Sequence, residues 1–195
     1  MKVTFRKVVR DYIAMSRYVA LGSLDGILTV LSISLTAAIM GISSGNAVNT
    51  MAVGLTGLSG GIAIALSNGF GSYVGEHAEE GKLIRELEST MLLEERKLDD
   101  TIIHQQAKYR VYMSMLTHGS ASFMGSFIPS IPFFLFNDIY TAISVTLVIC
   151  FVMMFVLGCY LGRISKESML STAFKIVVVG VLIVVISYLM GGGHG

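Results

Sequence analysis

One carboxylate stands inside an apolar stretch that is long enough to cross a membrane. Asp25 lies within RYVALGSLDGILTVLSISL, residues 17–35, and it is the one charged residue of 18–42. A charge at membrane depth is costly, so such a residue usually faces a cavity or a partner and has a function. Gly22 and Gly26 flank it in a pattern that lets another helix backbone, or a ligand, come close. Asp25 is therefore the first candidate for binding a cation.

Two further polar side chains are expected at the same depth as Asp25. Asp25, Asn68 and His118 are each eight residues from the charged residue at one end of their apolar run. These charged residues are Arg17, Glu76 and Arg110 respectively. Eight residues correspond to about 12 Å along a helix. A carboxylate, an amide and an imidazole together suit Fe²⁺, Mn²⁺, Co²⁺ or Zn²⁺. The alternative is that Asn68 and His118 only form hydrogen bonds between helices.

An acidic segment, residues 76–110, separates the second apolar run from the third and holds nine acidic and six basic residues. Its apolar positions recur at helical intervals, which predicts a helical hairpin in water. Glu76, Glu79 and Glu80 fall within about one turn and can share a face that attracts divalent cations. A solvated acidic surface is the alternative.

Three other side chains are secondary candidates for the metal site. Ser72 could donate a hydrogen bond or bind the ion, although a packing role is simpler. Met113 and Met115 lie near the mouth of the third apolar run, where their sulfur atoms could contact a softer metal.

The elements that must position these residues are membrane helices. The chain of 195 residues is 53% hydrophobic and 14% charged, compared with about 25% charged in a soluble domain. The pattern predicts an all-α polytopic membrane protein, because about 20 apolar residues span a bilayer. Five transmembrane helices are expected, at 18–42, 47–74, 111–136, 139–161 and 170–190.

Basic residues set the expected orientation. Residues 1–17 read as a basic amphipathic helix on the cytoplasmic face, and the acidic insert 76–110 also carries Lys and Arg. Five spans then leave the tail, 191–195, outside. The domains expected are therefore 1–17, spans one and two in 18–75, the insert 76–110, spans three to five in 111–190, and the tail. Nothing favours a nucleic-acid partner.

Three stretches resemble the vacuolar iron transporter family. They are LGSLDGILT, GLSGGIAIALSNGFGSYVGEHAEE and HGSASFMGSFIPSIPF, and the resemblance covers most of 18–136. It implies a homodimer of five-span chains that exports ferrous iron, and often manganese, from the cytosol in exchange for protons. By this resemblance Asp25 falls on the family's aspartate, and Glu76 and Glu79 begin a metal-collecting helix. We interpret Asp25 as the core ligand or proton carrier.

The chain also departs from the family pattern. The family usually has a methionine in span two followed by G-E-Y, whereas this chain has Asn68 followed by Gly71, Ser72 and Tyr73. The acidic insert is also much shorter than the family's metal-binding domain.

The sequence thus predicts a transporter of Fe²⁺, or Mn²⁺, in the cell membrane of a prokaryote or a vacuolar-type membrane of a eukaryote. The metal is substrate, and no cofactor is expected. No catalytic motif is present, so an enzyme is not expected. Two alternatives stay open: a scaffold or metal sensor whose acidic hairpin docks a partner, and a passive metal channel.

Overall fold

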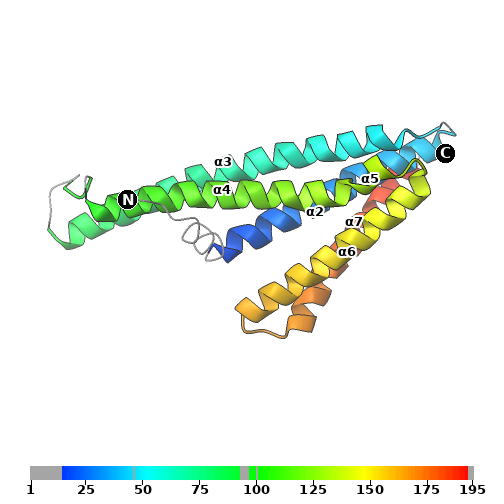
Figure 1. The fold of residues 1–195 in the computed structure, drawn as a ribbon. Coiled ribbons are helices and arrows are strands. Elements are labelled where there is room, and N and C mark those ends of the chain that lie inside the picture. Colours follow the sequence, from blue (N-terminus) through cyan, green and yellow to red (C-terminus); the bar gives the residue numbers. More distant parts are fainter. Residues whose placement is uncertain (1–14, 46, 93–96, 100, 193–195) are drawn as a thin grey trace.

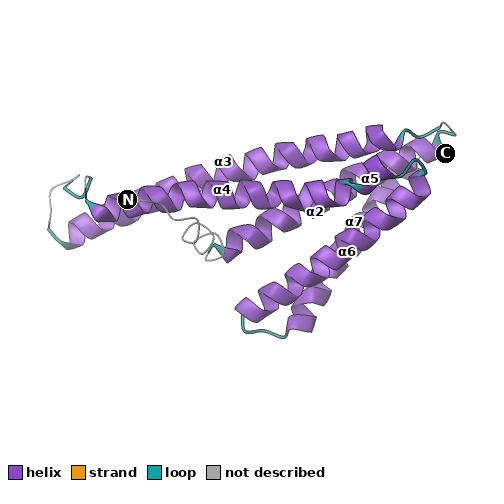
Figure 2. Ribbon diagram, viewed as in Figure 1, coloured by secondary structure: helices purple, strands orange, loops and turns teal. Residues whose placement is uncertain are grey.

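The computed structural model describes residues 15–45, 47–92, 97–99 and 101–192. This part of the chain is helical, and Figure 2 shows no strand within it. Its helices are α2 (Ser16–Ser43), α3 (Thr50–Thr90), α4 (Ile102–Ser130), α5 (Pro132–Leu135), α6 (Ile139–Ile164) and α7 (Met169–Gly192). Most of the predicted N-terminal helix, residues 1–14, and the end of the tail, 193–195, lie outside the described residues.

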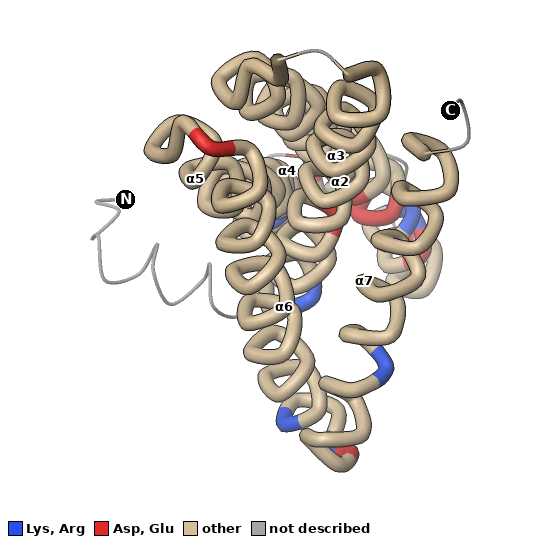
Figure 3. Tube along the Cα trace, turned by 90° about the vertical axis from the view of Figure 1, so that its right-hand side faces the viewer, with Lys and Arg blue, Asp and Glu red and all other residues tan. Residues whose placement is uncertain are grey.

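Four helices of the described part are long and apolar enough to cross a membrane, namely α2, α3, α6 and α7. Three of them match the predicted runs 18–42, 139–161 and 170–190 within a few residues. In Figure 3 α6 is uncharged along most of its length, because its charged residue is Arg163 in the last turn. Asp138 begins α6 by accepting hydrogen bonds from the backbone N–H and the hydroxyl of Thr141, at 2.8 and 2.7 Å.

The predicted third span, 111–136, falls on α4 and α5 instead of one apolar helix. Pro129 lies in the last turn of α4 and Pro132 opens α5, as expected of residues that interrupt a helix. α4 is not among the four apolar helices, because it carries a series of buried hydroxyl groups. These belong to Ser114, Thr117, Ser122, Ser126 and Ser130.

α3 is one helix of 41 residues, and it joins the second predicted span, 47–74, to the insert, 76–110, without a break. Its first turn is capped by Asn49, whose side chain accepts a 3.1 Å hydrogen bond from the N–H of Ala52. In its last turn, the buried carboxylate of Glu88 accepts a 3.0 Å hydrogen bond from the N–H of Leu98, which lies beyond the end of the helix. α4 then returns beside α3 (Figure 1).

α2 is the central helix, with contacts to α3, α4, α6 and α7. On one side Ile27 and Leu31 pack with Cys150 and Met154 of α6 in a buried apolar cluster. On the other side α4 comes so close that a Cβ at Gly26 would clash with its backbone. This contact holds the stretch around Asp25 against the polar face of α4.

Candidate metal site

Three helices bring Asp25 and Asn68 together. The side-chain amide of Asn68, on α3, donates to Asp25 Oδ2 of α2 at 2.8 Å and to the Ser122 hydroxyl of α4 at 2.9 Å. Ser122 in turn donates to the carbonyl of His118, one turn back in its own helix, at 2.9 Å. The half-buried carboxylate is therefore held on one side by an amide whose own orientation is fixed by a second bond.

His118 meets Ser72 instead of Asp25. The Ser72 hydroxyl and His118 Nδ1 are 2.5 Å apart, and the Tyr18 ring lies 5.4 Å from the imidazole, tilted by 47°. The other ring nitrogen, Nε2, is buried and has no hydrogen-bond partner among the described residues. The expected trio at one depth is therefore two pairs, Asp25 with Asn68 and His118 with Ser72, about one turn of α3 apart.

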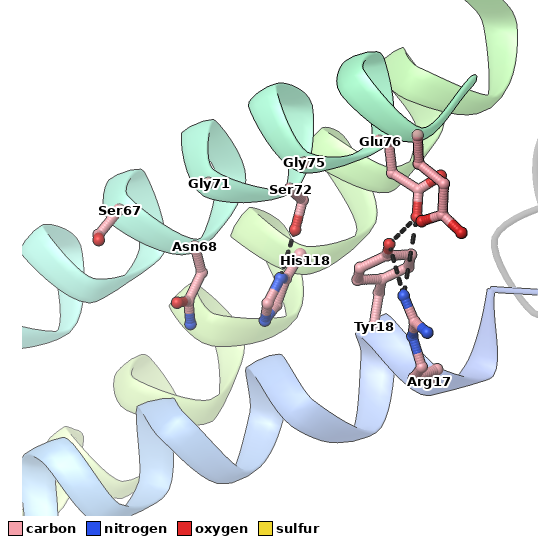
Figure 4. A pocket seen from close by; sticks show the side chains of 10 residues that line it. Arg17, Tyr18, Ser67, Asn68, Gly71, Ser72, Gly75, Glu76 and His118 are labelled. Atoms are coloured by element: carbon pink, nitrogen blue, oxygen red, sulfur yellow. Dashed lines mark hydrogen bonds and ion pairs between the residues drawn. The ribbon is translucent and has the colours of Figure 1, made fainter. Parts of the chain in front are cut away.

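Asn68, Ser72 and His118 border a hollow of about 450 Å³ between α2 and α3, named here the inner hollow. Figure 4 shows Asn68 and Ser72 of α3 and His118 of α4 around it. Gly71 and Gly75 also line it, and because they carry no side chain the space stays open. The volume is enough for a cation that keeps part of its water shell.

A network of side chains stands at the mouth of the inner hollow (Figure 4). Glu76 accepts a short hydrogen bond from the hydroxyl of Tyr18, and its carboxylate lies 3.7 Å from the Arg17 guanidinium. Arg17 also donates to the Tyr18 hydroxyl at 2.9 Å. Glu79 lines the same hollow and is exposed. Two of the three predicted carboxylates of the insert thus face the mouth.

The third carboxylate faces the other way. Glu80 is buried against α4, where both of its oxygens accept from the guanidinium of Arg110, the longer of the two contacts being 2.6 Å. The hydrogen bonds from Arg110 to Glu80 raise the pKa of Arg110, so the guanidinium stays charged. The geometry therefore indicates a structural ion pair for Glu80.

The two methionines lie away from the inner hollow. Met113 is buried, and Met115 lines an apolar depression on the outer side of α3 and α4, beside Gly69 and Gly119. Within the described part of the chain, no three His, Cys, Asp or Glu side chains are grouped closely enough to hold a metal ion. An ion in the inner hollow would need amide, hydroxyl or water oxygens in addition to a carboxylate.

Sequence reasoning missed three residues that the structure adds to the site. Ser122 fixes the Asn68 amide. The sequence feature that could have identified Ser122 is its position one turn after His118. Tyr18 and Arg17 contact Glu76. The sequence feature that could have identified them is their position at the start of the apolar run that contains Asp25.

The chain is similar to known sequences over most of its length. A family model described as the VIT family matches residues 82–192, which include His118 and leave out Asp25 and Asn68. An uncharacterised protein of the archaeon Methanocaldococcus jannaschii is 31% identical over 175 residues, which cover 90% of this chain and 87% of that protein.

Proposed function

The chain belongs to the VIT family of membrane metal transporters, and on this premise we propose that it moves Fe²⁺ or Mn²⁺ out of the cytosol in exchange for protons. The observation that carries the proposal is the pairing of Asp25 with Asn68 beside the inner hollow. Asp25 is a carboxylate in a helix that is apolar enough to span a membrane. Its partner Asn68 lines the inner hollow, whose mouth carries Glu76 and Glu79.

The chemistry of one carboxylate supports exchange. A metal ion binds a carboxylate only in its deprotonated form, so a proton and a metal compete for Asp25. If the site at Asp25 switches between the two faces of the membrane only when it holds a metal ion or a proton, the two ions move in opposite directions. Asn68 Oδ1, Ser72 and His118 are the neighbouring groups that complete the coordination of an ion, together with water.

We propose α4 and α5 as the remaining membrane span. Five hydroxyl side chains that lower the apolar character of α4 are buried, namely Ser114, Thr117, Ser122, Ser126 and Ser130. Several of their hydroxyls donate to the carbonyl one turn back, for example Ser126 to Ser122 at 2.9 Å and Ser130 to Ser126 at 2.8 Å. A helix whose polar groups are satisfied internally is tolerated within a bilayer. Five spans with a cytoplasmic N-terminus then leave the C-terminus outside.

Aromatic and basic side chains support a cytoplasmic interface at the mouth of the inner hollow. Tyr73 of α3 and Tyr112 of α4 lie with ring centres 5.9 Å apart, and Tyr18 of α2 contacts Glu76, one turn from Tyr73. Tyrosine is enriched where membrane meets water, and Arg17 and Arg110 at this end fit the excess of basic residues on the cytoplasmic side. The ends of α3 and α4 beyond this level then extend into the cytosol.

A second copy of the chain completes the proposal. Asp25 lines a second depression, of about 350 Å³, beside Thr29 and Ser32. In a single chain within a bilayer this carboxylate would be close to lipid, which is unfavourable, whereas a homodimer that covers the depression would shield it. The second copy would also supply the further ligands that one chain lacks.

Metal uptake into proteoliposomes tests the proposal. The purified chain is reconstituted, and entry of Fe²⁺, Mn²⁺, Zn²⁺ and Mg²⁺ is measured with and without a pH gradient. The proposal predicts uptake of the first two that depends on the gradient. Uptake without that dependence would indicate a channel, and no uptake of any metal at any pH would indicate a scaffold or sensor.

A further inference from the structure

Asp25 and Asn68 stand between two hollows, which together are named here the groove. Asn68 lines the inner hollow, and Asp25 lines the depression of about 350 Å³, named here the outer hollow. The hydrogen bond of 2.8 Å that joins these two side chains thus connects the wall of one hollow to the wall of the other. The outer hollow is lined by Asp25, Leu28, Thr29, Ser32, Ile33 and Ile64.

Helical spacing puts both hollows on the same faces of α2 and α3. On α2, Tyr18 of the inner hollow is followed at intervals of seven, four and three residues by Asp25, Thr29 and Ser32. On α3, Asn68 of the inner hollow lies one turn from Ile64 of the outer hollow. Residues at these intervals form one stripe along a helix, so the two hollows follow one line along α2 and α3.

The groove is closed beyond the outer hollow, because α2 and α3 touch there. A Cβ at Gly60 would clash with the side chain of Ile33, and a Cβ at Gly57 would clash with the hydroxyl of Ser34. The groove is therefore open at the end of Glu76, crossed by the Asp25–Asn68 bond in the middle, and shut by helix contact at the far end.

We propose that Asn68 is a gate, whose hydrogen bond to Asp25 separates the inner hollow from the outer hollow and must break before a divalent cation can pass. The inference rests on the proposed function, and it adds a second cation-holding position to it. The outer hollow offers the Asp25 carboxylate and the hydroxyls of Thr29 and Ser32, which are hard oxygen ligands suited to a partly hydrated divalent cation.

The chemistry of the amide explains why the cation itself opens this gate. Asn68 directs its NH₂ group to Asp25, and an NH₂ group is a donor that repels a cation instead of binding it. A cation that takes Asp25 Oδ2 must displace this donor. Rotation of the side chain then presents the amide oxygen, which is an acceptor and can bind the same cation. Ser122, the second acceptor of the NH₂ group, holds Asn68 in the closed orientation until that happens.

Accessibility of single cysteines tests the gate without requiring transport. Ser32→Cys reports on the outer hollow, and Ser67→Cys, the matched serine replacement, reports on the inner hollow. The full chain is reconstituted in liposomes, and a membrane-impermeant thiol reagent is added in the absence of metal. The native cysteines, Cys150 and Cys159, belong to α6, and the unmodified chain gives their background rate.

The gate predicts a specific dependence on Asn68. Ser67→Cys should react at the same rate with Asn68 or with Asn68→Ala, which also shows that the inner hollow keeps its shape. Ser32→Cys should react slowly with Asn68 and about tenfold faster with Asn68→Ala, the change expected for the loss of one hydrogen bond. Ser122→Ala, which leaves Asn68 in place with one bond fewer, should give an intermediate rate.

Equal rates of Ser32→Cys modification in the three backgrounds, whether fast or slow, would overturn the gate. The result is separable from the proposed function. A chain that shows this dependence on Asn68 and yet carries no metal would refute transport, whereas a chain that exchanges metal for protons without the dependence would refute the gate alone.

Discussion

The carboxylate of Asp25 in α2 accepts a 2.8 Å hydrogen bond from the side-chain amide of Asn68 in α3, across 43 residues of sequence. This bond joins two helices that are each apolar enough to cross a membrane. It also lies between the two hollows that the groove contains.

Replacement of Asp25 by asparagine should abolish metal uptake into proteoliposomes. The amide keeps the shape of the side chain but loses the negative charge and the exchangeable proton. The variant should elute from a sizing column as the native protein does. Asp138→Asn is the matched control, because it makes the same change at an exposed helix cap where asparagine also serves as a cap, and it should transport normally. Native uptake rates in Asp25→Asn would contradict the assignment.

The double replacement Glu76→Gln with Glu79→Gln should raise the metal concentration needed for half-maximal uptake and leave the maximal rate unchanged. Both carboxylates line the mouth of the inner hollow, where they concentrate cations without holding them in the path. Glu86→Gln is the control, since Glu86 is exposed and forms a surface pair with Lys82 at 3.7 Å. Loss of uptake at saturating metal would instead assign Glu76 or Glu79 to the central site.

Replacement of His118 by alanine should shift the preference of the transporter toward Mn²⁺ and away from metals that favour nitrogen ligands. It should also alter the pH dependence of uptake, because it removes a titratable side chain from the wall of the inner hollow. Relative uptake of Fe²⁺, Mn²⁺ and Zn²⁺ is measured at two pH values. Ser72→Ala is the companion variant, since it keeps the imidazole and removes its partner. If His118 serves only to join helices, the metal ratios will be the same in the variant at both pH values.

Removal of the Glu80 charge should lower stability and leave metal affinity unchanged. Glu80 is buried and paired with Arg110, whose side chain is 49% exposed, so the expected loss for Glu80→Gln is about 1 to 2 kcal/mol. Unfolding in detergent measures the loss, and uptake at several metal concentrations checks the affinity. If the half-maximal metal concentration changes as much as in the Glu76 and Glu79 double variant, Glu80 takes part in metal capture at the mouth of the inner hollow.

The cap at Asp138 should stabilise α6 in a pH-dependent manner. Hydrogen bonds from the hydroxyl and then the N–H of Thr141 lower the pKa of Asp138 below its ordinary value. A lowered pKa in the folded chain means that the stabilisation is complete above the ordinary pKa of an aspartate and is lost as the pH falls through the folded value. The difference in unfolding between native and Asp138→Ala chains should therefore be larger at about pH 6 than at about pH 3. An equal difference at both values would show that the ionised cap contributes nothing.

Hydropathy predicted much of the fold, and the resemblance to the vacuolar iron transporter family is confirmed by the comparisons. The runs around α2, α6 and α7 were recognisable because their apolar side chains are continuous. α4 was harder, because serines that face other helices lower its apolar character as much as serines that face water would. Composition does not distinguish the two, so five spans remain a prediction.

Depth along a helix predicted part of the candidate site. The count of eight residues put Asp25 and Asn68 at one level, and their side chains meet. The same count does not give the direction of a side chain around its helix, and His118 turns toward Ser72. Glu80 likewise faces Arg110 of α4 instead of the groove. Which carboxylates of α3 point into the groove depends on where α4 packs, and the count does not give that position.

Exchange of metal for protons at Asp25 is tested most directly by recording both ions at once. Proteoliposomes with a pH-sensitive dye in the lumen receive Mn²⁺ outside, with no gradient imposed. We expect Mn²⁺ to enter while the lumen becomes more alkaline, and we expect Asp25→Asn to show neither change. Entry of Mn²⁺ without any change of luminal pH, or equal exchange in Asp25→Asn, would contradict this expectation.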